Sequence, residues 1–438
     1  MRRTCVFLPV CSAKNTCDAI MAFVRLACLT ILIIAGSAYA DSSVNGSDNP
    51  IAGPVVNPKT NPKTDANPVV RFHAWGGSAQ VNSYLKWVAD RVERKHGIAL
   101  KHVKLADTSD AVSRVLAEKA ADNLHNGSVD LIWINGENFA AMKKNALLAK
   151  GWVGDIANFA LTNPDSNSAM VTDFGEPTLG MEAPWGKASM VFYYRKSHFD
   201  SFNKPVPQTI HALLQFSQQQ PGRFTYPVVT DYLGISFIKY AAIALNSSNQ
   251  SLFYKPVTQN ALEKITPSLW TYLDALHPTM WRNGEYMVRQ ASQLQRLIDS
   301  GELSLAFSFT AAEIPSAVER FDLPRDVRTF AMSDGSLANV HFIGLTFNSP
   351  NQAAAKTVVN FLLSPKAQAK KQRLQVWGDD TVLDTNLLSP SQKSMFETQQ
   401  SHPSALDKSQ STPLYAEPHA SWTDALRQAW EERYGARY

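Results

Sequence analysis

The 438-residue chain is predicted to fold as an α/β protein of two lobes, preceded by an export signal and a polar leader. Two observations carry this prediction. From Val69 onward, short apolar strands alternate with amphipathic helices, a pattern typical of a parallel sheet covered by helices on both faces. The segment from Val69 to Tyr438 also exceeds the roughly 100–200 residues of one domain. Strand-like segments at Ser189–Arg195 and Leu337–Phe347 are the expected crossings between the lobes.

The first forty residues have the layout of a secretory signal peptide. Arg25 supplies the charged region, Leu26–Ile34 is the apolar core, and an Ala-Tyr-Ala cleavage site ends at Ala40. We therefore predict export to the periplasm with cleavage after Ala40. The apolar run is much shorter than the ~20 residues needed to span a bilayer, which favours a cleaved signal over a membrane anchor.

The residues before this signal raise two further points. Residues 1–20 are long and mixed for a charged region, so Met21 is an alternative start. Cys28 lies near the start of the apolar core instead of ending it, which argues against a lipid-attachment cysteine. All four cysteines of the chain precede the predicted cleavage site: Cys5, Cys11, Cys17 and Cys28. We expect the mature chain to have no disulfide and no Cys-based metal site.

Export also changes the charge balance of the chain. The signal peptide contains four of the 42 basic residues and one of the 38 acidic residues, namely Arg2, Arg3, Lys14, Arg25 and Asp18. The mature chain is therefore nearly neutral, with a net charge of +1 that follows from these counts. Near-neutrality gives no electrostatic argument for binding to nucleic acid or to an anionic membrane, and we expect neither.

The segment at 41–68 is rich in Asn, Pro, Ser and Gly and contains a tandem Asn-Pro-Lys-Thr repeat. It has almost no apolar side chains to bury, so we predict a disordered or polyproline-like leader. No later segment is long and apolar enough to cross a membrane. We expect the mature protein to be a soluble monomer.

Three apolar strands are predicted in the first half, at Val69–Ala74, Ile98–Lys104 and Val129–Ile134, with helices between them. In open α/β sheets, ligands bind at the carboxyl ends of such strands, where helices begin. The loops at Trp75–Ser78 and Asn135–Asn138 occupy these positions, so topology alone makes them candidate ligand-binding loops.

The second lobe is predicted to have its own strands at Phe224–Val229 and Leu303–Phe309, and a helix at Tyr286–Ser300. The expected division of the chain is a signal peptide at 1–40, a leader at 41–68, lobe one at 69–192 plus 340–438, and lobe two at 193–339.

Four ordered blocks of the sequence resemble type II periplasmic solute-binding proteins. They are the Trp75-Gly76-Gly77 loop with its helix, Asp130–Trp133 with the turn at Asn135–Glu137, Ile298–Phe307, and Ile343–Pro350 with Phe361–Pro365. The resemblance implies the two-lobed "Venus flytrap" fold, a small ligand between the lobes, and delivery of that ligand to an inner-membrane ABC permease. The related branch binds iron, thiamine and polyamines, so a thiamine-like compound, a polyamine or a sugar is an expected ligand.

Iron is the least expected of these ligands. The iron-binding members hold the metal through adjacent tyrosines late in lobe two, and this chain has no such pair there. Tyr193 and Tyr194 are adjacent but fall in a predicted crossing strand, where core packing is favoured.

In lobe one, the glycine loops allow backbone N–H groups to approach a ligand at the N-terminus of a helix. Ser78 fits a ligand contact or a helix N-cap, and Glu137 fits a ligand contact or a favourable interaction with the helix dipole. Trp75 and Trp185 fit ligand stacking and core packing equally, whereas Trp133 lies inside an apolar strand and fits the core. The predicted ligand-binding residues of lobe one are Trp75, Gly76, Gly77, Ser78, Asn135, Gly136, Glu137 and Trp185.

In lobe two, Thr230 and Asp231 follow a predicted strand and fit equally a ligand role and an N-cap role. The predicted ligand-binding residues of lobe two are Tyr226, Thr230, Asp231, Tyr286, Ser308 and Thr310, of which Tyr286 rests on the family pattern alone. The acidic candidates Glu137 and Asp231 favour a cationic or neutral ligand, although Lys187 would oppose that preference.

No catalytic motif is found. The segment Gly180–Lys187 has five residues between its glycines where a phosphate-binding loop has four, and Ala188 replaces the Ser or Thr that binds magnesium. We therefore expect no catalytic residues, no metal and no cofactor. Two alternatives to a transport function remain, namely a periplasmic hydrolytic enzyme and a ligand-sensing partner of a membrane receptor.

Overall fold

The computed structural model describes residues 67–397, 402–407 and 412–438, which belong to one compact unit. The predicted signal peptide, its cleavage site and the leader up to residue 66 lie outside these residues. Within the described ranges, no helix combines the length and apolar character needed to cross a membrane.

The buried apolar side chains form two separate cores, each surrounded by its own strands and helices. We call the elements around them lobe one and lobe two. The strands of lobe one are β1 (Val69–Trp75), β2 (Ala99–Leu105), β3 (Leu131–Ile134), β4 (Thr172–Asp173), β5 (Glu176–Pro177), β6 (Glu182–Ser189), β10 (Ser336–Leu345) and β11 (Leu414–Ala416). Its helices are α1 (Ala79–His96), α2 (Thr108–Ala120), α3 (Gly136–Lys144), α10 (Gln352–Leu362), α11 (Pro365–Gln372) and α12 (Pro390–Lys393), with 3-10 turns at Val153–Asp155, Ala157–Thr162, Ser168–Met170 and Thr385–Leu387.

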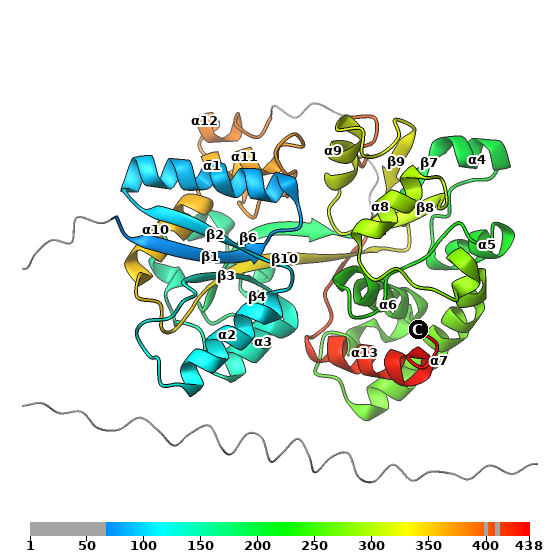
Figure 1. Ribbon diagram of the computed structural model, residues 1–438, viewed down its shortest axis with the longest axis horizontal. Helices are drawn as coiled ribbons and strands as arrows, with labels where there is room; N and C mark the ends of the chain where they lie inside the picture. The colour runs from blue at the N-terminus through cyan, green and yellow to red at the C-terminus, as the bar shows by residue number, and fades with distance from the viewer. Residues whose placement is uncertain (1–66, 398–401, 408–411) are drawn as a thin grey trace, which may run out of the picture. The chain divides into compact units, whose positions relative to one another are not determined.

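The main sheet of lobe one has the order β11-β10-β3-β1-β2, and β6 also pairs with β10. The predicted parallel pairing of the first three strands is confirmed, whereas β10 joins β3 antiparallel. Helix α1 covers one face of this sheet and helices α2 and α3 cover the other (Figure 1). Ser78 caps α1, and the apolar face of α1 predicted from its spacing is buried.

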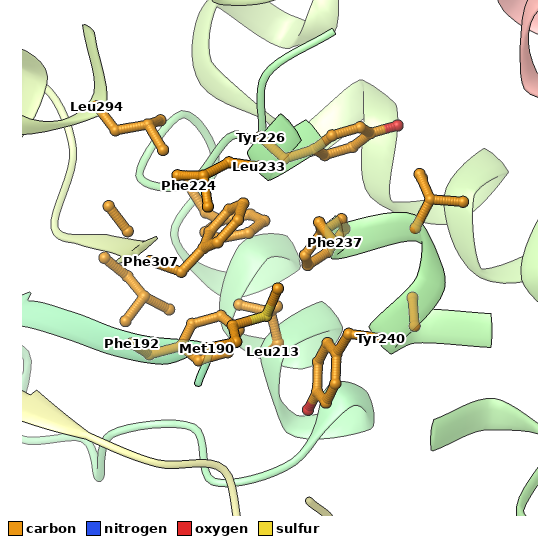
Figure 2. Packing of buried hydrophobic residues seen from close by; sticks show 14 of the residues in the cluster. Met190, Phe192, Leu213, Phe224, Tyr226, Leu233, Phe237, Tyr240, Leu294 and Phe307 are labelled. Carbon is orange, nitrogen blue, oxygen red and sulfur yellow. The ribbon is translucent and has the colours of Figure 1, made fainter. Parts of the chain in front are cut away.

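Lobe two is built on an antiparallel sheet of order β8-β7-β9. Its strands are β7 (Val191–Arg195), β8 (Leu305–Ser308) and β9 (Val327–Phe330), and its helices are α4 (Lys196–Phe202), α5 (Ile210–Gln219), α6 (Tyr232–Leu245), α7 (Gln259–Leu276), α8 (Ser292–Asp299), α9 (Glu313–Glu319) and α13 (Ser421–Tyr434), with 3-10 turns at Ser247–Leu252, His277–Thr279 and Trp281–Gly284. Helix α6 is apolar nearly all round and is buried in this core. Figure 2 shows Phe237 of α6 beside Phe224, Tyr226 and Phe307, whereas the ring of Tyr240 packs against Phe192.

Three sequence predictions for this region need correction. Residues Phe224–Val229 form no strand, because Pro227 has no N–H for a ladder and makes only an isolated bridge to Val288. The helix expected at Tyr286–Ser300 is only α8. The C-terminal helix α13 was expected in lobe one, but it buries Trp422 and Trp430 in the core of lobe two.

The chain passes between the lobes at β10, at the junction of β6 with β7, and again between β11 and α13. The backbone N–H of Met190, which separates β6 from β7, donates to the Leu337 carbonyl at 2.8 Å. The Ser336 hydroxyl donates to the Met190 carbonyl. Strand β11 pairs with the same end of β10, from Ser336 to Ala338. These bonds join the crossing segments to one another.

A buried histidine in lobe two makes stability dependent on pH. Burial lowers the pKa of His277 from 6.5 to about 4, while its Nε2 lies 2.6 Å from the Tyr226 hydroxyl. Because the folded pKa is the lower one, the stability from neutral His277 is fully present above pH 6.5 and is lost as pH falls toward 4. Wild type should lose about 2.5 kcal/mol through this group between pH 7.5 and 4.5.

Urea unfolding of His277→Gln and wild type at both pH values tests this prediction. The variant lacks the titrating ring, so its stability deficit should be largest at pH 7.5 and shrink at pH 4.5. The exposed His211→Gln is the control and should not change the pH dependence. A deficit for His277→Gln that is equal at both pH values would contradict the assignment.

Candidate functional site

Side chains from the two lobes meet at the beginning of helices α3 and α6. Glu137 of α3 lies 3.8 Å from the guanidinium of Arg427 of α13. Asn339, on the crossing strand β10, donates through Nδ2 to the hydroxyl of Tyr232, the first residue of α6, at 2.7 Å. We call this region the acidic junction, because carboxylates predominate in it.

A buried ion pair lies at the centre of the acidic junction. Lys239 of α6 and Glu417, which follows β11, are both buried, and Nζ lies 2.6 Å from Oε2. The ammonium also lies 4.8 Å from the ring centroid of Phe174 and 5.9 Å from that of Tyr232. Aromatic rings and a carboxylate around one ammonium form an environment that suits organic cations. Asn339 Nδ2 donates to the other Glu417 oxygen at 3.3 Å.

Two more carboxyl groups lie beneath this pair, in lobe one. Asp173 accepts from the backbone N–H of Gly136 at 2.8 Å through Oδ2, but its Oδ1 is buried without a partner. Both carboxyl oxygens of Glu182 are also buried without a partner. Burial, followed by the nearby charges of Glu137 and Glu417, raises the pKa of Asp173 well above its usual range. Burial and then the charge of Asp173 do the same for the pKa of Glu182.

The acidic junction therefore has more acidic than basic groups. Its four carboxyl groups belong to Glu137, Asp173, Glu182 and Glu417, whereas its cations are Lys239, Arg427 and Lys143, whose charge acts on Glu182. Groups buried without partners destabilise a fold by about 1–3 kcal/mol each, more when charged, and such sites are candidates for function. A positively charged ligand would favour the ionised forms of Asp173 and Glu182, whose pKa values are raised.

In the first predicted ligand-binding loop, Trp75–Ser78, most groups are already used in packing and in backbone hydrogen bonds. A Cβ on Gly76 would meet Lys104 at 2.5 Å, and one on Gly77 would meet the Trp75 ring at 2.6 Å, so close packing already requires both glycines. The Gly76 N–H donates to the Leu105 carbonyl, and the Ser78 hydroxyl accepts from the Val81 N–H. Trp75 is exposed over Gly77 and is thus accessible to a ligand.

The second predicted loop lies in the acidic junction. Gly136 is in the left-handed region, with φ of +58°, and its N–H is used by Asp173. Asn135 occupies the N-cap position of α3 without a side-chain cap bond. Glu137 is partly exposed near Arg427. The structure thus brings Glu137 together with residues that were not predicted.

Trp185 is a core residue, which corrects the prediction of a ligand role. It is fully buried and packs edge to face against Trp133 at 5.0 Å and Trp377 at 5.2 Å. Its carbonyl accepts from Nζ of the buried Lys371, which also pairs with Asp379. Trp133, expected in the core, is only half-buried.

Tyr226 and Asp231 also have structural roles, one in the core and one at a helix N-terminus. Tyr226 is fully buried in the core of lobe two, and its hydroxyl accepts from the Trp430 indole N–H at 2.9 Å. Asp231 is the N-cap of α6 and accepts from the N–H groups of Leu233 and Ala291, so the capping alternative holds for it. Thr230 beside it is exposed.

The remaining predicted residues of lobe two lie in different places. The Ser308 hydroxyl donates to Oε2 of the partly exposed Glu313 at 2.5 Å and accepts from the Thr310 N–H. Ser308 and Thr310 precede α9, and Glu313 is its first residue. The Ser316 hydroxyl of α9 accepts a hydrogen bond from Gln80 Nε2 of α1 at 2.7 Å. This bond is a second contact between the lobes. Tyr286 is exposed elsewhere in lobe two.

Sequence analysis missed most of the acidic junction, including Asp173, Glu182, Lys239 and Glu417. One signal was available for Lys239, a single charge inside the otherwise apolar run that forms α6. Asp173 lies on the two-residue strand β4, Glu182 is the first residue of β6, and Glu417 follows a segment with no periodicity. No local pattern joins these four residues.

Comparisons with known proteins identify the family of the chain. Residues 87–384 match the family model described as bacterial extracellular solute-binding protein. The chain belongs to this family. It is also 39% identical to protein YnjB of Escherichia coli K12 over 366 residues, covering 84% of this chain and 91% of YnjB. The predicted resemblance to solute-binding proteins is confirmed.

Solved structures show the same fold as this solute-binding protein. One is a putative spermidine/putrescine ABC transporter from Listeria monocytogenes, with 13% identity, a TM-score of 0.56 and coverage of 84% of this chain and 100% of that chain. Another is the periplasmic binding protein AfuA from Actinobacillus pleuropneumoniae with fructose-6-phosphate bound, with 13% identity, a TM-score of 0.58 and coverage of 83% and 98%. The predicted two-lobed α/β fold is confirmed.

Replacing Glu182 tests the cost of the unpartnered carboxyl. Burial raises the pKa of Glu182, so the folded protein favours the protonated carboxyl. The stability from this protonated form is fully present below about pH 4.5 and is lost as pH rises through the pKa of the folded state. Thermal unfolding of Glu182→Gln should show a melting temperature that rises relative to wild type from pH 5 to pH 8.5. The exposed Glu263→Gln is the matched control and should show no such trend. A pH-independent difference for Glu182→Gln would contradict this account.

A double-mutant cycle tests the buried ion pair. Lys239→Met leaves Glu417 buried without its partner and should lower the free energy of unfolding by about 3–5 kcal/mol in urea. Lys239→Met combined with Glu417→Gln should restore part of this loss, since no unpaired charge remains. The same cycle on the exposed pair Lys196 and Asp200 should give a coupling below ~1 kcal/mol. Strictly additive effects at Lys239 and Glu417 would show that the pair is not coupled.

Proposed function

We propose that this protein is exported to the periplasm, cleaved after Ala40, and serves there as the ligand-binding subunit of an ABC importer. It captures a small cationic solute between its lobes and delivers it to an inner-membrane permease. Membership in the extracellular solute-binding family and the signal-like sequence support export, and the transporter neighbours support an importer. As a monomer without catalytic groups or cofactor, it acts by binding and not by turnover.

The observation that carries the ligand class is the excess of carboxyl groups in the acidic junction. Glu182 and Asp173 are buried with oxygens that lack partners, and Glu417 is neutralised only by Lys239. The exposed ring of Tyr232 offers a cation–π contact, whereas the buried ring of Phe174 already faces the Lys239 ammonium. A thiamine-like compound or a polyamine meets this chemistry better than a neutral sugar does.

Closure of the lobes follows from where the ligand contacts lie. Glu137 belongs to lobe one, Tyr232 to lobe two, and Asn339 to the crossing strand. A ligand that contacts all three has more contacts when the lobes are closed, so it shifts the population toward the closed form. The closed form is then the state that a permease recognises. Trp75 and Thr230, both exposed at lobe-facing loops, are further proposed contacts.

The test is identification of the ligand, followed by binding measurements. Mass spectrometry of compounds released from the purified protein gives candidates, and calorimetry then tests putrescine, spermidine, thiamine, a neutral sugar and a sugar phosphate. We expect a cationic compound to bind one to one. At a hundredfold excess over Kd it should stabilise the fold by about 2.7 kcal/mol. Glu137→Gln and Tyr232→Leu should each weaken binding at least tenfold.

Glu263→Gln removes the same charge at an exposed position of lobe two and should leave affinity unchanged. Binding of only the sugar phosphate or the neutral sugar would overturn the cationic ligand class. Conversion of a compound to product, without stoichiometric binding of any, would favour the enzyme alternative instead.

A further inference from the structure

A basic cavity lies on lobe one, away from the acidic junction. Its volume is about 550 Å³, and its wall includes Arg91, Arg94, Lys95, His96 and Lys366. This volume lies within the ~300–1,000 Å³ range of small-molecule sites. The basic residues of α1 that line it lie roughly 20 Å along the helix from Gln80, which contacts lobe two. No residue of the acidic junction lines the cavity, so the two are separate.

The positive charges around the cavity are not compensated. Among the residues that the structure describes, no acidic side chain lines the cavity, and no ion pair involves Arg91, Arg94, Lys95 or Lys366. Arg94 Nε instead donates to a backbone carbonyl, that of Asp90. Arg91 lies three and four residues before Arg94 and Lys95, spacings at which like charges destabilise a helix slightly. Asp90, four residues before Arg94, offsets part of this repulsion on the helix surface.

Helix electrostatics explain only part of this arrangement. Arg94, Lys95 and His96 occupy the last turn of α1, where cations favour the helix dipole. Arg91 lies a turn earlier. Lys366 is the second residue of α11, an end where the dipole disfavours a cation. Two of the five basic residues are thus placed without benefit to either helix.

Neighbouring side chains hold parts of this wall in place. The Arg91 guanidinium lies 5.8 Å from the centroid of the Trp87 ring, which in turn packs against Phe361 of the cavity wall at 6.0 Å. Asn360 accepts from the Asn158 N–H through Oδ1, so its Nδ2 remains as a donor at the wall. Arg91 and Arg94 are exposed, and their guanidinium groups and the Asn360 amide are donors that suit phosphate oxygens.

We propose that this basic cavity binds a small polyanion with a phosphate or pyrophosphate group. The guanidinium groups of Arg91 and Arg94 bind the phosphate oxygens, and Lys95 and Lys366 balance the remaining charge. The phosphate belongs either to a soluble anion or to the headgroup of an anionic lipid at the membrane where the importer resides. The site is independent of the ligand class proposed for the acidic junction.

The test uses the full mature chain and two probes. Inorganic pyrophosphate is titrated by calorimetry, and vesicles of phosphatidylglycerol or of phosphatidylcholine are tested by co-sedimentation. The cavity variant is Arg91→Gln, Arg94→Gln and Lys366→Gln. The control variant, Arg289→Gln, Arg296→Gln and Lys264→Gln, removes the same charge from exposed positions of lobe two. Matching melting temperatures of all three proteins establish that each is folded.

We expect wild type and the control variant to bind one pyrophosphate, or to bind phosphatidylglycerol vesicles alone, with at least tenfold weaker binding by the cavity variant. Pyrophosphate binding identifies a soluble anion, and vesicle binding alone identifies the lipid headgroup. Binding of neither probe by wild type would overturn the proposal. An equal loss in the control and cavity variants would also overturn it, because the attraction would then be diffuse charge.

Discussion

Strand β10 is the element on which the arrangement of the acidic junction depends. It pairs with β3 inside lobe one, with β6 along most of its length, and with β11 at its first residues. Its pairing with β6 places Asn339 opposite Ala188 and Gly344 opposite Glu182. Asn339 then reaches both Tyr232 and Glu417. One hydrogen-bonded ladder thus fixes both the passage between the lobes and the positions of two polar residues.

The acidic junction is built at a cost to stability. The buried pair of Lys239 and Glu417 gives up hydration that its own attraction only partly replaces. Glu182 and Asp173 add carboxyl oxygens that have no partner at all. The larger hydrophobic core of lobe two, which includes most of α6, supplies the stability that offsets this cost. A fold selected for stability alone would place apolar side chains at these positions, so binding is the better explanation of them.

The parts of the fold that depend on local pattern were predicted well. The face of α1, the parallel strands and the two crossings follow from periodicity and strand order. Trp185 and Tyr226 could not be assigned, since an aromatic residue near a strand end has the same local sequence whether it faces a ligand or a core. Lys239 and Glu417 are far apart in the chain and meet only because α13 packs on lobe two. The same packing places α13 in lobe two, although residues 340–438 were predicted in lobe one. The amphipathic pattern of α13 shows that one face is buried, but it carries no information about which core buries it.

The net charge of the chain also gave no indication of how its charges are distributed. A mature chain with almost equal numbers of acidic and basic residues predicts no charged partner, yet the structure gathers carboxylates at one place and unpaired guanidinium groups at another. The carboxyl groups gather around the beginnings of α3 and α6, whereas the basic residues gather near the end of α1, which covers the opposite face of the sheet of lobe one from α3 (Figure 1). For this reason, charge is informative here only once the fold has shown which residues are neighbours.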